Sequence, residues 1–183
     1  SLSPFRGWMQ WHHTLGLFAG VFVMTWIVSG WLSMDHGRLF STPNASSELV
    51  QTVQGGPFSE ASAQVTIQQL QIYANARELT LHGFGGQGRI VAKAIGGTTS
   101  TPALDIEHVA QVVQQALPEV DVLRWGVVTP GDLYTDLREG RLPAGTIRIE
   151  LADPNQTWLH IDSHSGQIRS VIDRSRRVYR WVY

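Results

Sequence analysis

Two adjacent histidines, His12 and His13, stand at the start of an apolar stretch that runs from Leu15 to Leu32. Ionisable side chains at membrane depth are costly and usually face a protein interior or a cofactor. A neutral imidazole is also a good axial ligand for haem iron. Because neighbouring residues of a helix point ~100° apart, the two imidazoles cannot serve one site. One of them can therefore be a ligand while its neighbour meets the headgroups; the alternative is that both are interfacial.

The apolar stretch is long enough to cross a membrane. No Asp, Glu, Lys or Arg occurs from Gly7 to Met34, and ~20 apolar residues span a ~30 Å hydrocarbon layer. The tryptophans near its ends, which fit aromatic belts at the two interfaces, are Trp8, Trp11 and Trp31. The sequence therefore predicts a transmembrane helix over about residues 8–33. The alternatives are a cleaved signal peptide, which would have a shorter core and a better cleavage site, and a buried helix of a soluble domain.

Flanking charges and small residues indicate how this helix is placed. Arg6 precedes the helix and Asp35 follows it, which favours a cytoplasmic N-terminus and places the rest of the chain outside the cytoplasm. Gly16 and Gly20 form a G-x-x-x-G pattern that lets another helix approach closely, although this pattern also arises by chance. We expect a lipid bilayer and further transmembrane helices as partners. His36, just past the helix, is either an interfacial residue or a second cofactor ligand.

The rest of the chain has the composition of a soluble domain. The net charge of −1 gives no field that would favour nucleic acid as a partner. The absence of cysteine excludes disulfides and thiolate metal sites. We find no convincing nucleophile triad or carboxylate pair for hydrolysis, so the sequence assigns no catalytic residue.

Periodicity and turn residues predict an α+β fold. Residues 41–60 are rich in Ser, Thr, Pro, Gly and Asn, and we expect a linker or irregular loop there. Thr66 and Gln69 form a capping box that opens a short helix, while Asp105 caps a second helix that Pro118 ends. The predicted strands are 78–82, 89–94, 120–128, 146–152, 157–161 and 167–172. A helix followed by two strands, twice over, favours helices packed on an antiparallel sheet in two repeated units.

Two further motifs are assigned to turns. The segment Gly83–Gly88 matches G-x-G-x-x-G, but a dinucleotide site needs a helix after it, and residues 89–94 alternate like a strand. We therefore expect a hairpin loop. His160, Asp162 and His164 would share one face of a strand, where they could hold a metal ion. The residues from Asp162 onward are instead typical of a tight turn in which Asp accepts backbone N–H groups, so no metal site is predicted.

The order of several short motifs resembles the family of PepSY-associated transmembrane proteins. His12-His-Thr-Leu-Gly16, followed by an apolar span that ends at Ser29-Gly30, resembles their first transmembrane helix. Later motifs are similar to the PepSY domain and to the basic, aromatic approach to the next helix: Asp132-Leu-Tyr, Trp158-Leu-His-Ile-Asp, Ser165-Gly166, Asp173-Arg174 and Arg180-Trp-Val. The resemblance covers the two ends of the chain well and residues 40–100 poorly.

This resemblance implies a bacterial inner-membrane protein with several helices and a periplasmic PepSY domain, of which the chain is the N-terminal part. The implied division is 1–38 with the membrane helix, 39–63 as a linker, 64–173 as the PepSY-like domain and 174–183 as the start of the approach to a second membrane helix. Some relatives are haem-containing reductases of ferric siderophores. His12 matches the family's histidine and is therefore the first candidate ligand of haem b, with His13 and His36 as the others. A bis-histidine site would need helices beyond this chain.

Two functions are expected on this basis. The first is haem-dependent electron transfer across the membrane to a periplasmic ferric siderophore or another iron chelate. The second is a membrane-tethered PepSY module without catalysis that restrains a peptidase, senses a ligand or serves as an accessory subunit. Further membrane helices bearing histidines would favour the first function.

Overall fold

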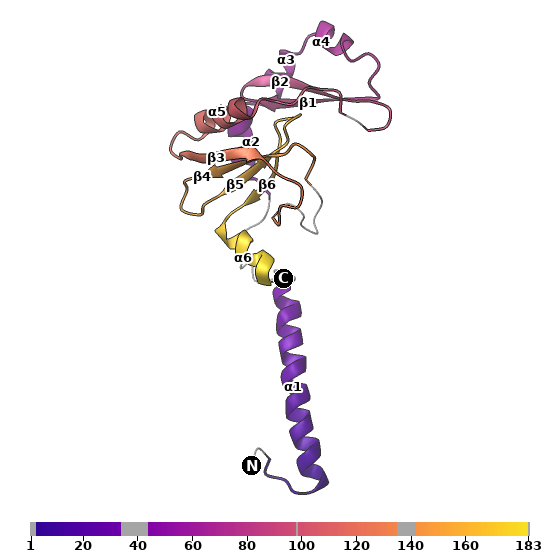
Figure 1. Cartoon of the computed structure of the whole chain (residues 1–183), viewed down its shortest axis with the longest axis vertical. Helices are drawn as coiled ribbons and strands as arrows, with labels where there is room; N and C mark the ends of the chain where they lie inside the picture. The colour runs from indigo at the N-terminus through magenta and orange to yellow at the C-terminus, as the bar shows by residue number, and fades with distance from the viewer. Residues whose placement is uncertain (1–2, 34–43, 98, 135–141, 183) are drawn as a thin grey trace. The chain divides into compact units, whose positions relative to one another are not determined.

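The computed structural model describes residues 3–33, 44–97, 99–134 and 142–182, which belong to two compact units (Figure 1). The first unit contains the residues up to Phe40, and the second contains Ser41–Val182. Each unit has its own architecture and is described separately below.

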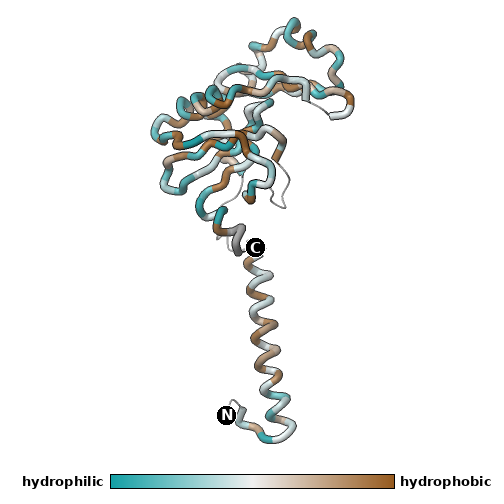
Figure 2. The backbone as a smooth tube through the Cα atoms, viewed as in Figure 1, coloured by the Kyte–Doolittle hydropathy of each residue, from teal (hydrophilic) through white to brown (hydrophobic). Residues whose placement is uncertain are grey.

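The first unit contains a single long helix, α1 (Trp8–Ser33), of 26 residues. Its bounds agree with the prediction from the apolar stretch. The helix is predominantly apolar along its length (Figure 2), and none of its residues is buried by the protein. A helix that is hydrophobic on all sides is suited to lipid or to contact with other apolar helices. By its length and composition, α1 can span a membrane.

The second unit has an α+β fold, as predicted. Its helices are α2 (Ser47–Gln54), α3 (Phe58–Ala63), α4 (Ile67–Gln71), α5 (Ile106–Ala116) and α6 (Arg174–Val182). Its strands are β1 (Glu78–Phe84), β2 (Gln87–Lys93), β3 (Val122–Val127), β4 (Ile147–Leu151), β5 (Trp158–Ile161) and β6 (Ile168–Ile172). β1 and β2 form an antiparallel hairpin, and the other strands form an antiparallel sheet in the order β3-β4-β5-β6.

The segment that we expected to be a linker or irregular loop contains two helices, so this prediction was wrong. Ser46 caps α2 by accepting a hydrogen bond from the backbone N–H of Leu49, and Gly55 ends the helix in the left-handed conformation. Val53 of α2 and Ala61 of α3 are buried. α2 places Leu49, Val50 and Val53 on one face, but helices this short are stabilised mainly by tertiary packing.

One hydrophobic core joins the hairpin, the helices and the sheet of the second unit. Its main members come from α2, β1, α5, β4 and β5: Val53, Phe84, Val109, Val113, Ile147, Ile149, Leu159 and Ile161. Alternation along β4 sends Ile147, Ile149 and Leu151 into this core, so Arg148 and Glu150 lie on the opposite face of the sheet. That opposite face carries the polar residues considered in the next section.

Glycines in the Gly83–Gly88 segment serve the hairpin, as predicted. Gly85 and Gly86 have φ values of 57° and 78° and form the tight turn between β1 and β2, where positive φ favours glycine. Gly88 is required for a different reason, which is close packing: an added Cβ would lie 2.1 Å from the carbonyl oxygen of Ala61 on α3. The motif therefore lets α3 pack directly on the hairpin backbone.

Replacing Gly88 with alanine should destabilise the second unit. The new methyl group would meet backbone rather than a movable side chain, and overpacking of this kind costs about 1–3 kcal/mol. The matched control is Gly126→Ala, because nothing lies within 4 Å of a Cβ at Gly126, and its effect should stay within about 0.5 kcal/mol or be stabilising. Urea unfolding of the detergent-solubilised chain, followed by tryptophan fluorescence, measures both. Equal unfolding free energies for the two variants would contradict the close contact.

Candidate functional site

A buried histidine lies at the centre of the sheet face opposite the core. His160 on β5 is 0% exposed, and the strand register places it between Arg148 on β4 and Ser170 on β6. Nε of Arg148 donates to Nε2 of His160 at 3.0 Å, and Nδ1 of His160 lies 2.9 Å from Oγ of Ser170. Arginine has no acceptor, so Nε2 must accept. The neutral ring therefore carries its proton on Nδ1 and donates it to Ser170.

Arg148 connects this histidine to the loop after β3 and to an aromatic cluster. Its Nη2 donates to Oδ1 of Asp132 at 2.8 Å. Its guanidinium lies 4.4 Å from the ring centre of Trp158, and the guanidinium of Arg177 on α6 lies at the same distance from that ring. The ring of Tyr134 meets Trp158 edge-on at 5.2 Å. Residues from the loop after β3, from β4 and β5, and from α6 therefore meet around the ring of Trp158.

We call Asp132, Arg148, Trp158, His160 and Ser170 the His160 network. Burial and the charge of Arg148 lower the pKa of His160 to about 4, against the opposing effect of Asp132. Burial raises the pKa of Asp132, but hydrogen bonds from the Arg148 side chain and the Tyr134 backbone outweigh it and lower the pKa overall. At neutral pH the network thus combines a neutral imidazole with a guanidinium–carboxylate pair. Both ring nitrogens of the buried imidazole are engaged by Arg148 and Ser170.

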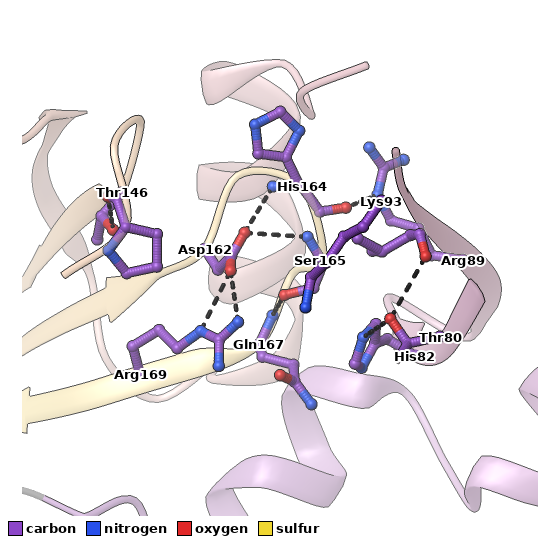
Figure 3. A network of polar contacts seen from close by, with 12 residues as sticks. Thr80, His82, Arg89, Lys93, Thr146, Asp162, His164, Ser165, Gln167 and Arg169 are labelled. Carbon is purple, nitrogen blue, oxygen red and sulfur yellow. Dashed lines mark hydrogen bonds and ion pairs between the residues drawn. The ribbon is translucent and has the colours of Figure 1, made fainter. Parts of the chain in front are cut away.

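A second polar network holds the turn between β5 and β6 (Figure 3). Asp162 accepts hydrogen bonds from the backbone N–H groups of His164 and Ser165, and its other oxygen lies 2.6 Å from Nη2 of Arg169. Burial raises the pKa of Asp162, but the hydrogen bonds from Arg169 and the two backbone groups lower it overall. Arg89 on β2 donates to the carbonyl oxygen of His164, which ties the turn to the hairpin. The predicted turn with Asp162 as acceptor is confirmed.

The alternating residues His160, Asp162 and His164 have three different environments. His160 belongs to the sheet network, Asp162 to the turn, and Nδ1 of His164 lies 2.8 Å from the carbonyl oxygen of Thr101. Within residues 3–33, 44–97, 99–134 and 142–182, no group of three His, Asp or Glu side chains is placed to hold a metal ion. The turn thus separates residues that a straight strand would have aligned.

The histidines considered as haem ligands differ in their surroundings on α1. His12 is exposed, whereas His13 is half-buried and meets the ring of Phe5 edge-on at 5.3 Å. Nδ1 of His13 has no hydrogen-bond partner among the described residues. His36 lies outside the described residues, so its predicted role stays a prediction.

One face of α1 combines the first ligand candidate with the small residues. His12, Gly16 and Gly20 follow one another at intervals of four, and residues at this spacing lie on the same side of a helix. Open space surrounds the position of a Cβ at both glycines. We call these three residues the His12 row. A helix packed along the two glycines would therefore run past His12.

Sequence reasoning considered His160 only as a metal ligand and missed its network. Two features of the sequence pointed to a polar network on this face of the sheet: a charged residue inside the alternating strand β4 and a histidine inside β5. Neither shows which residues meet, because this depends on the register of β4, β5 and β6. Comparison of the chain with protein-family models, curated proteins and solved structures found no match.

The stability of the protein should fall as the pH drops from 6.5 towards 4. The unfolded chain protonates His160 near its ordinary pKa of 6.5, whereas the folded chain keeps it neutral down to a pKa of about 4. Between these values the unfolded state binds more protons, so the free energy of unfolding decreases with falling pH, by up to about 3 kcal/mol.

Urea unfolding at several pH values between 7 and 4 tests this expectation. The variant His160→Gln cannot titrate and should show a flatter pH dependence than the unaltered chain. His108→Gln is the control, because His108 is exposed and lies outside the network. If His160→Gln retained the full pH dependence, another group would be responsible.

Proposed function

We propose that the chain is the membrane-anchored part of a haem-dependent electron-transfer protein of the bacterial inner membrane. In this proposal α1 crosses the bilayer, the second unit lies in the periplasm as a PepSY-like domain, and the His12 imidazole would hold the iron of haem b. The observation that carries the proposal is the His12 row, which combines a ligand and a helix-packing surface on one face of an otherwise uncharged helix.

The donor set of α1 fits one axial position. His12 is exposed on the side of the helix, and His13 points ~100° away from it. A second protein ligand would therefore come from another helix, which Gly16 and Gly20 allow to approach closely. Haem supplies the one-electron chemistry when bound. A ring nitrogen of His12 would hold the haem, and Gly16 and Gly20 would admit the neighbouring helix. The tryptophans near the ends of α1 would set its depth in the bilayer.

The proposed electron acceptor is a ferric siderophore or another periplasmic iron chelate. Support for this substrate class comes from the resemblance to haem-containing members of the PepSY-associated family. In the second unit, the side chains of the two polar networks bond to one another and to the backbone. We therefore assign the redox step to the membrane part and leave the second unit the role of binding or positioning.

A membrane-tethered binding module without haem is the second candidate. It is favoured by exposed apolar side chains on β3, where Leu123, Trp125 and Val127 are each about half exposed. Such side chains on the surface of a sheet are typical of a protein interaction site. In this alternative the second unit restrains a peptidase, senses a ligand or supports another membrane protein.

A visible spectrum separates the two candidates. The full-length protein that contains this chain, purified from membranes of haem-replete cells, should show Soret and α bands after reduction. His12→Ala should abolish these bands because it removes an axial ligand, whereas the matched variant His13→Ala should retain them. A folded but colourless preparation would rule out haem and favour the binding module. Loss of the bands in His13→Ala alone would move the ligand to the neighbouring residue.

A further inference from the structure

Strand β3 forms an open edge of the four-stranded sheet. Among the strands of the described residues, β3 pairs with β4 alone, and the backbone N–H of Val128, just after β3, donates to the carbonyl oxygen of Thr146 at 2.8 Å. Hydrogen-bonded and non-hydrogen-bonded pairs alternate along an antiparallel ladder. Trp125 and Val127 therefore direct their N–H and C=O groups away from β4. Within the part of the chain that the structure describes, no other group bonds to them.

The same edge carries apolar side chains that the described protein leaves half exposed: Leu123, Trp125 and Val127. Free backbone groups and exposed apolar side chains make an edge strand a template for pairing with another strand. A register shift between Val122 and Arg124 interrupts the ladder at one end, and Pro130, which lacks an N–H, follows at the other. The edge therefore offers one short segment of defined length.

We propose that β3 pairs antiparallel with β3 of a second copy of this chain, about a two-fold axis at Trp125. In this register Trp125 lies opposite Trp125 of the second copy, and Leu123 lies opposite Val127. Arg124 lies opposite Gly126. Trp125, which directs its backbone groups outward, thus meets Trp125 of the second copy. The strand Leu-Arg-Trp-Gly-Val complements itself because apolar residues stand at equal distances on both sides of Trp125.

The charge of Arg124 and the open space at Gly126 favour this register over the two adjacent registers. Nothing lies within 4 Å of a Cβ at Gly126, so the Arg124 side chain of the second copy has room beside it. Glu150 is the partner of Arg124 in the ladder with β4, so an opposite charge lies on the same face. Moving the register one step places Arg124 opposite Arg124, which is unfavourable. Moving it the other way places Leu123 opposite Thr129 and removes the Trp125 pair.

Self-complementarity is the reason to choose a second copy over an unrelated peptide. A two-fold pairing uses the same patch on both copies and closes after two chains. The pairing involves only residues of the second unit, so it does not depend on haem. Anchoring of both copies in one membrane, if α1 spans it, raises their effective concentration and favours the pairing further.

Cysteine cross-linking tests the pairing directly because the chain contains no cysteine. Two full chains with different tags are produced together, one with Arg124→Cys and the other with Gly126→Cys. Residues opposite each other in a non-hydrogen-bonded pair have Cα atoms about 4.5 Å apart, which is within the range of a disulfide. Mild oxidation of the membranes should yield severalfold more disulfide-linked heterodimer than a control pair carrying Ile95→Cys, an exposed residue on the loop after β2.

A variant that blocks the edge completes the test. Val127→Pro removes an outward N–H without removing a bond to β4, and it should reduce the heterodimer to the level of the Ile95→Cys control. Trp125→Lys leaves the backbone intact and should act in the same direction, with circular dichroism as the check on folding. Cross-linking at the control level in the original pair would overturn the proposal, as would undiminished cross-linking in folded forms of the two blocking variants.

Discussion

The surface of α1 is the constraint on which the rest of this protein depends. The helix carries no Asp, Glu, Lys or Arg, and none of its residues is buried by the protein. Its backbone hydrogen bonds are satisfied within the helix, so the helix meets the requirement for crossing a bilayer, whereas in water its apolar side chains would remain exposed at a large free-energy cost. The chain is accordingly divided into a unit suited to an apolar medium and a unit with its own core.

In the second unit, both faces of the four-stranded sheet carry buried residues. α5 and the hairpin bury the apolar face. On the other face, His160 is buried without access to water, and burying a polar group costs free energy unless it is hydrogen-bonded. Arg148 and Ser170 provide these bonds, and Asp132 balances the charge of Arg148. The network thereby holds Asp132, in the loop after β3, to Arg148 on the sheet.

Local features of the sequence predicted most of the elements. The apolar run of α1, the glycine turn of the β1–β2 hairpin and the Asp162 turn each depend on a few neighbouring residues, so a short stretch of sequence contains the necessary information. α2 and α3 were missed because packing of Val53 and Ala61, rather than their own periodicity, stabilises them. The His160 network was missed because strand register decides its contacts. The ligand role of His12 stays a prediction, since a second helix would have to complete the site.

Topology is the most direct test of the central claim that α1 separates the chain between two compartments. Single cysteines can be introduced at Phe5 and at Ile95 in this cysteine-free chain, on opposite sides of α1 in the sequence. In intact cells whose outer membrane has been made permeable, a maleimide that cannot cross the inner membrane should label Ile95→Cys. Phe5→Cys should react only after the inner membrane is opened. Equal labelling of both cysteines, or the reverse order, would contradict the account.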